Sequence, residues 1–116
     1  MKVFEIAELL QGEVITGEEL IDIEITSACG SDMMSDVLSY VKNQGLLLTG
    51  LTNPQSVRTA DMMDMHCIVF VRGKKPDQDT IRLAKERDII LIATSMPMFK
   101  ACGLLYKNGL DEGASK

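Results

Sequence analysis

Small hydroxyl residues, glycines and basic residues follow several apolar stretches of this chain, and these residue types are the ones with which proteins bind anions. Three apolar runs end in such groups, which are Thr49-Gly50, Arg72-Gly73-Lys74 and Thr94-Ser95. A fourth group, residues 26–32, follows an alternating segment. In a parallel sheet, ligands bind at the loops after the carboxyl ends of the strands. If a ligand binds, we therefore expect contacts from Ser27, Gly30, Ser31, Thr49, Gly50, Asn53, Arg72, Gly73, Lys74, Thr94 and Ser95.

The chemistry of these loops suits a small anionic metabolite or a nucleotide. Glycines allow close backbone approach, and hydroxyls and amides at helix starts donate hydrogen bonds. Arg72 or Lys74 would offset ligand charge. The alternative is structural: the same residue types form turns and helix caps, and Arg72 pairs with a local acid such as Asp77. Neither a Gly-x-x-x-x-Gly-Lys-Ser/Thr nor a Gly-x-Gly-x-x-Gly motif is present.

No catalytic set is identifiable, so we expect a protein that is not an enzyme and has no cofactor and no metal site. His66 is the only histidine and precedes a strand, at the pole opposite to the loops. The three cysteines, Cys29, Cys67 and Cys102, include no Cys-x-x-Cys pair. Cys67 reads as a buried small hydrophobe. Cys29 precedes a predicted helix start, where a thiol pKa can be lowered, so a reactive thiol remains an alternative.

The elements that position these loops alternate between strand and helix. Unbroken apolar runs at 46–49, 67–71 and 89–93 are typical of strands covered on both faces, as in parallel sheets. Capped helical patterns lie between and after them, from Asn53 to Met63, from Pro76 onward, and from Pro97 to Asn108-Gly109. We expect the last three strands to be parallel and adjacent in the core, with right-handed crossovers.

The first half of the chain is less regular. Residues 4–10 fit a short amphipathic helix, 13–17 a short strand, and 21–25 a half-exposed strand because they alternate strictly. A further helix opens at Ser31-Asp32 and is closed by Gly45, with an apolar face made of Met34, Val37, Leu38 and Val41. The acids of residues 22–36 are attributed to exposed faces. The fold class is therefore α/β: three layers, with a mostly parallel sheet of about five strands and helices on both faces. Residues 4–109 form one domain, and 110–116 a short flexible tail.

Composition limits the partners. The chain has 116 residues with 12 basic and 17 acidic side chains, a net charge of −5. An acidic domain has no general attraction for phosphate backbones, so we expect no nucleic-acid partner. No segment is long and apolar enough for a bilayer, so we expect no membrane association and a cytoplasmic location. Eight methionines, several of them on predicted helical faces, serve either as core or as an adaptable homodimer contact.

The order of motifs resembles the DRTGG domain family. The resemblance is carried by Glu13–Gly17, Ile23–Met34, Leu46–Gly50 and Val69–Lys74, and it extends over about Phe4 to Gly109. The chain is also similar, more distantly, to the N-terminal domain of HPr kinase, which is not the kinase domain. The resemblance implies a regulatory domain of the kind that accompanies CBS domains or catalytic domains, here as a free-standing copy.

Two function classes follow. In the first, the chain is a non-catalytic regulatory or sensor domain that binds a small anionic metabolite or nucleotide at the carboxyl edge of the sheet. In the second, it is an interaction module that docks on a partner enzyme without a small ligand.

Overall fold

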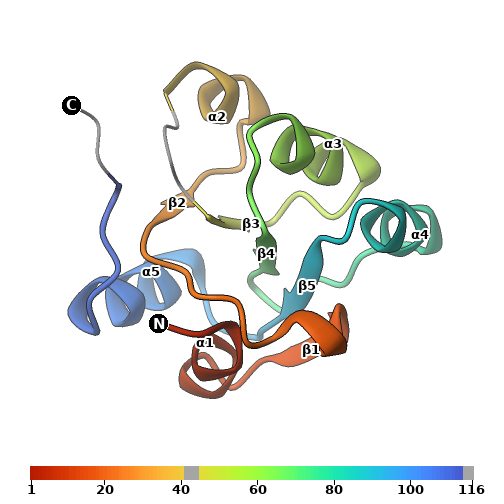
Figure 1. Ribbon diagram of the computed structural model, residues 1–116. Coiled ribbons are helices and arrows are strands. Elements are labelled where there is room, and N and C mark those ends of the chain that lie inside the picture. Colours follow the sequence, from red (N-terminus) through yellow and green to blue (C-terminus); the bar gives the residue numbers. More distant parts are fainter. Residues whose placement is uncertain (41–44, 114–116) are drawn as a thin grey trace.

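A five-stranded sheet with the strand order β1-β5-β4-β3-β2 forms the centre of the protein in a computed structural model, which describes residues 1–40 and 45–113 (Figure 1). The strands are β1 (Glu13–Thr16), β2 (Ala28–Gly30), β3 (Leu46–Thr49), β4 (Cys67–Phe70) and β5 (Ile90–Ala93). Strands β2 to β5 are parallel, and β1 is antiparallel to β5. The predicted α/β class, the mostly parallel sheet and the adjacency of the last three strands are confirmed.

The three inner strands are apolar because helices cover both of their faces. Every residue of β3, β4 and β5 is buried. Alternate residues of β4 therefore serve two cores: Cys67 and Val69 face one, and Ile68 and Phe70 face the other. A strand of this kind needs no polar face, which explains the unbroken apolar runs.

The helices divide unevenly between the two faces (Figure 1). Helices α2 (Met34–Tyr40), α3 (Pro54–Met62) and α4 (Gln78–Glu86) connect neighbouring parallel strands and pack on one face. Such crossovers share one hand, so they lie on the same side. Helices α1 (Val3–Leu9) and α5 (Met98–Lys107) cover the other face. None of the described helices has the length and apolar composition needed to cross a bilayer.

Residues 21–25 are not a strand of the sheet, which corrects the sequence-based assignment. The backbone carbonyls of Ile21 and Ile23 instead accept hydrogen bonds from the first amides of α1, and Ile25 N donates to Met1 O. The alternation arises because Ile21, Ile23 and Ile25 pack against the α1–α5 core. The second strand of the sheet is β2, which starts three residues later and contains only Ala28, Cys29 and Gly30.

Two predictions, the apolar face of α2 and the flexible tail at the chain end, are met only in part. Val41, expected on the apolar face of α2, lies outside the described residues, and Leu38 of the same predicted face is exposed. Leu110 and Asp111, expected in a flexible tail, instead pack on the fold: Leu110 is buried, and Asp111 O accepts a hydrogen bond from Ala28 N. Residues 114–116 lie outside the described residues.

Candidate functional site

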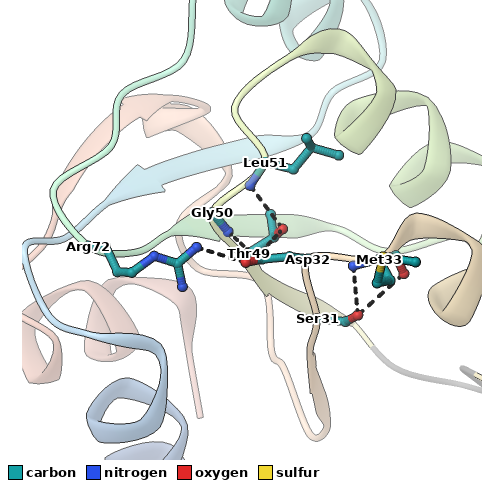
Figure 2. A network of polar contacts seen from close by, with 7 residues as sticks. All are labelled: Ser31, Asp32, Met33, Thr49, Gly50, Leu51 and Arg72. Atoms are coloured by element: carbon teal, nitrogen blue, oxygen red, sulfur yellow. Dashed lines mark hydrogen bonds and ion pairs between the residues drawn. The ribbon is translucent and has the colours of Figure 1, made fainter.

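A single carboxylate, that of Asp32, gathers donors from the ends of two neighbouring strands (Figure 2). Its Oδ1 accepts hydrogen bonds from Gly50 N at 2.6 Å and from Thr49 Oγ1 at 3.2 Å. Its Oδ2 accepts from Arg72 Nη2 at 2.8 Å. Thr49 and Gly50 lie at the end of β3, and Arg72 lies just beyond β4. An amide, a hydroxyl and a guanidinium thus converge on one anionic group, and we call these three donors the cradle.

The backbone on either side of Asp32 is fixed without help from its side chain. Ser31 N donates to Leu48 O and so continues the pairing of β2 with β3. Ser31 Oγ accepts from Met33 N at 3.0 Å, which closes a tight turn around Asp32. The turn is therefore held on both sides of Asp32, and the carboxylate is free to change its rotamer without unwinding α2.

Arg72 has a left-handed backbone, with φ of 63°, a conformation that costs a non-glycine residue about 1 kcal/mol or more. Two hydrogen bonds to the loop after β5 hold the turn: Arg72 N donates to Met96 O and Gly73 N donates to Thr94 O. This turn directs the Arg72 side chain back across the end of β3 toward Asp32 (Figure 2). The strained turn is thus fixed by backbone bonds on one side and by the ion pair on the other.

Gly50 has no side chain because the guanidinium occupies that space. A Cβ at this position would lie 1.9 Å from Arg72 Nη2. The absence of a Cβ lets the Gly50 amide and the guanidinium approach the same carboxylate. Gly50 therefore contributes to the site in two ways: its amide donates to Asp32, and its missing Cβ leaves room for the guanidinium.

The cluster is accessible to water. The side chain of Asp32 is 49% exposed and that of Arg72 38%. The hydrogen bond from the Gly50 amide, together with Arg72 and Thr49, lowers the pKa of the Asp32 carboxyl below its ordinary value. Asp32 is therefore ionised at neutral pH, and its pair with Arg72 lies where a dissolved anion can reach it.

The structure brings together four of the eleven predicted site residues. Thr49, Gly50 and Arg72 belong to the cradle, and Ser31 forms the turn beside it. Gly73, Lys74 and Ser95 lie exposed on the same edge. Among the described residues, the Lys74 ammonium and the Ser95 hydroxyl make no hydrogen bond or ion pair. These three residues are open to solvent but do not converge on the cradle.

The other four predicted site residues serve the fold. Asn53 caps α3, because its side chain accepts from Gln55 N. Thr94 is buried and donates to Leu10 O at 2.7 Å. Gly30 faces α5, where a Cβ would lie 2.7 Å from Cys102 Sγ. Ser27 precedes β2 and lies buried at the opposite edge of the sheet, which corrects its predicted place.

The alternative that Arg72 pairs with an acid is the arrangement that the structure shows, but the acid is Asp32 and not Asp77. The Asp77 side chain accepts from Thr80 N and Thr80 Oγ1 and so caps α4. Asp32, expected on an exposed helical face, is the residue that organises the site. The loop that contains Asp32 was expected at the carboxyl edge, but its carboxylate was assigned to an exposed face, because its partners Gly50 and Arg72 lie far away in the sequence.

The thiols and the histidine stay apart from this cluster. Cys29 lies within β2, half-buried, and burial raises its pKa, with smaller contributions from Cys102 and Asp36. Cys29 therefore lacks the helix start on which the alternative of a reactive thiol was based. Burial likewise raises the pKa of Cys67 and of Cys102. His66 is exposed at the opposite pole, before β4.

The gap between β4 and β5 is where a ligand crevice usually opens in a sheet of this kind. Helix α4 follows β4 onto one face, and α5 follows β5 onto the other, and such divergence opens a crevice between two strand ends. Here the hydrogen bonds from Arg72 N and Gly73 N to the β5 loop span that gap. Within the described residues, no cluster of His, Cys, Asp and Glu is arranged to hold a metal ion. Polar groups that are both accessible and convergent therefore lie one strand further along, at the ends of β2 and β3, whereas Lys74 and Ser95 are exposed but do not converge.

Comparison with known proteins agrees with this architecture. The family model described as "DRTGG domain" matches residues 5–107. A solved structure of the CBS and DRTGG domains of the regulatory region of Clostridium perfringens pyrophosphatase, complexed with the activator diadenosine tetraphosphate, superimposes with a TM-score of 0.74 at 18% identity. The match covers 90% of this chain and 45% of that one. A search of curated proteins gives no significant match. The chain belongs to the DRTGG domain family.

Proposed function

We propose that residues 4–109 form a non-catalytic regulatory domain that binds a small anionic metabolite or nucleotide at the carboxyl edge of the sheet. The observation that carries the proposal is the cradle, in which Thr49 Oγ1, Gly50 N and Arg72 Nη2 converge on one carboxylate. Three donors aimed at one negative group are the arrangement with which proteins hold phosphates and carboxylates. A cytoplasmic setting is part of the same proposal.

Two further facts support a nucleotide or a phosphorylated metabolite as the ligand. Arg72 uses only one of its five N–H groups on Asp32, and within the described residues its side chain makes no other hydrogen bond. A guanidinium with spare donors binds a phosphate in bidentate fashion. The related pyrophosphatase region was solved with a nucleotide activator, diadenosine tetraphosphate.

A thermal-shift titration tests the proposal. The probes are inorganic phosphate, ATP and diadenosine tetraphosphate, and the variants are Arg72→Ala and Arg58→Ala. Arg58 is a matched control because it is an exposed arginine on α3. A ligand at 100 times its Kd stabilises the folded state by about 2.7 kcal/mol, which raises the Tm by several degrees. We expect this rise in the parent protein and in Arg58→Ala but not in Arg72→Ala. No rise with any probe, or an equal rise in Arg72→Ala, would contradict it.

A second function, docking on a copy of itself or on a partner enzyme, is favoured by α5. Phe99 is 91% exposed and Tyr106 68%, and seven residues place them two turns apart on one face of the helix. In a two-fold dimer with antiparallel α5 helices, each Phe99 meets Tyr106 of the partner subunit. A cavity of about 140 Å³, with Cys102, Leu105 and Leu110 among its lining residues, lies beside Tyr106. The related structure comes from the regulatory region of an enzyme, which supports the enzyme alternative.

Light scattering after gel filtration tests the docking proposal. We expect a dimer mass for the parent protein and a shift toward the monomer for Phe99→Ser. Met62→Ser on α3 is the control, because Met62 is 70% exposed on a different helix. A monomer mass for the parent protein would leave a partner enzyme as the remaining form of this proposal, to be sought with the α5 variants. Equal effects of the two substitutions would remove α5 as the surface.

A further inference from the structure

The cradle is filled by the protein's own carboxylate, and the proposed function leaves that occupancy unexplained. Asp32 is an acid placed among donors that suit an anion, at the point where an anionic ligand would have to bind (Figure 2). Ion pairs that are half exposed to water contribute little to stability, and both side chains here are more than a third exposed. The contact is therefore weak enough to exchange with a ligand from solution.

We infer that Asp32 is an internal competitor: the site is closed by its carboxylate, and a phosphate group binds by displacing it. The inference rests on the proposed function. A phosphate carries up to two negative charges and three acceptor oxygens, against one charge and two oxygens for the carboxylate. It can accept from Gly50 N and Thr49 Oγ1 and still take two donors from the guanidinium.

The displacement needs only a side-chain rotation. The turn that carries Asp32 is held by Ser31 N on Leu48 O and by Met33 N on Ser31 Oγ, and neither bond involves the carboxylate. The Gly50 amide and the Arg72 backbone are also fixed independently of Asp32. Gly50 directly follows β3, and Arg72 N donates to Met96 O. These groups therefore keep their places when the carboxylate leaves, and the Arg72 guanidinium pairs with the anion that replaces it.

This arrangement sets a minimum strength of interaction that a ligand must exceed in order to bind. A ligand has to overcome both the lost contacts of Asp32 and the repulsion between its phosphate and the displaced carboxylate. Weakly held or singly charged anions are rejected, whereas a terminal phosphate with its second charge is accepted. The freed carboxylate on the Ser31–Met33 turn is then the local change that a partner surface would sense.

Calorimetric titration of inorganic phosphate into the folded chain tests the inference. Asp32→Ala empties the cradle, and Asp36→Ala removes an equal charge from the exposed side of α2. We expect Asp32→Ala to bind phosphate at least about tenfold more tightly than the parent protein. Asp36→Ala corrects for net charge and should change affinity no more than about twofold. Adding Arg72→Ala to Asp32→Ala should abolish the gain.

A second variant guards against loss of fold. Asp32→Asn removes the charge but retains an oxygen for the Gly50 amide, and it should give a smaller gain in phosphate affinity than Asp32→Ala. Parallel titrations with ATP and diadenosine tetraphosphate distinguish terminal from bridging phosphates. ATP has a terminal phosphate and should gain by about the same factor as inorganic phosphate. Diadenosine tetraphosphate has only bridging phosphates, each with one charge and two free oxygens, and should gain less; an equal gain would show that the second charge plays no part in displacing Asp32.

The outcomes separate the inference from the proposed function. Equal affinity in the parent protein and Asp32→Ala, with binding lost in Arg72→Ala, would overturn the displacement and leave the anion site intact. Weaker binding in Asp32→Ala would make Asp32 a ligand-holding residue, which also overturns it. If no variant binds any of the probes, both the inference and the proposed function fail.

Discussion

At the β4–β5 end of the carboxyl edge the buried polar groups bond to backbone, whereas at the β2–β3 end two side chains and an amide converge on one exposed carboxylate. Thr94 is 3% exposed and its hydroxyl donates to Leu10 O, and the amides of Arg72 and Gly73 donate to the β5 loop. Asp32 is 49% exposed, and its carboxylate accepts from Thr49, Arg72 and the Gly50 amide. The residue types are those of a ligand site at both ends, but donors that converge at an exposed position are found at the β2–β3 end.

The difference follows from the connections that leave the sheet. Helices α4 and α5 diverge to opposite faces, so the fold must satisfy the backbone groups in the gap between β4 and β5, and it does so with internal hydrogen bonds. The connections after β2 and β3 run to the same face, and their loops lie side by side with no gap to fill. Polar side chains there do not have to satisfy backbone groups in a gap.

The largest effect on stability is expected from Thr94→Val, which tests the β4–β5 end. Valine preserves the volume but leaves the buried Leu10 carbonyl without its donor, and it removes the acceptor of Met96 N. We expect a loss of about 2 kcal/mol in the free energy of unfolding, measured by urea denaturation. Ser95→Ala, one residue on and exposed, should change it by less than about 0.5 kcal/mol. Equal effects would erase the contrast between the buried and the exposed hydroxyl.

Gly50→Ala tests the β2–β3 end and should lower the free energy of unfolding less than Thr94→Val does. The new Cβ forces the Arg72 head group away, since the two would be 1.9 Å apart, and a long side chain can move aside. We expect a loss of no more than about 1 kcal/mol in unfolding free energy, together with a loss of phosphate affinity of at least about tenfold. Unchanged affinity would move the anion site away from this edge.

Gly103→Ala is the matched control for a glycine without a steric role. Gly103 lies inside α5, and a Cβ there would meet nothing within 4 Å. Alanine is favoured over glycine in a helix interior, so this change should stabilise the protein by about 0.5–1 kcal/mol. Phosphate affinity should stay the same. Urea denaturation should show a lower free energy of unfolding for Gly50→Ala and a higher one for Gly103→Ala. This difference in sign would separate the close approach of Arg72 to Gly50 from the ordinary effect of helix propensity.

The smallest effect is the pH dependence of stability that Asp32 contributes. Its pKa is lower in the folded than in the unfolded protein, so its contribution is fully present above the unfolded value of about 3.9. It is lost as the pH falls through the folded value. At pH 7, Asp32→Asn should therefore be less stable than the parent by no more than about 1 kcal/mol, after allowance for its exposure. The difference in unfolding free energy should shrink toward zero as the pH falls from the unfolded value through the folded one, and a difference independent of pH would assign it to packing.

Most of the fold could be predicted from the sequence because the inner strands and their helices have distinctive local sequence patterns. Apolar runs such as Ile90–Ala93 have no polar face, and caps such as Asn53 and Asp77 mark where α3 and α4 begin. These signals do not depend on distant contacts. The carboxyl edge could therefore be located, and with it Thr49, Gly50 and Arg72.

The weak element was β2. A three-residue edge strand with Ala28, Cys29 and Gly30 has neither length nor β-branched side chains. The alternating residues 21–25 gave a stronger strand pattern, although they pack against α1.

Asp32 was missed for a different reason. The loop that contains it was expected at the carboxyl edge, but its pairing with Arg72 joins residues 40 positions apart, which no local pattern reports.

One measurement tests most directly whether the β2–β3 end is the anion site. The protein, labelled with ¹⁵N, is titrated with inorganic phosphate and then with diadenosine tetraphosphate, and each backbone amide is followed by NMR. The Gly50 N–H now donates to Asp32 Oδ1, so exchange of that acceptor must shift its resonance. We expect saturable shifts at Gly50 and its neighbours, with the Gly73 amide, bonded to Thr94 O, nearly unmoved. Shifts confined to the β4–β5 end, or an unmoved Gly50 amide at saturation, would contradict the account.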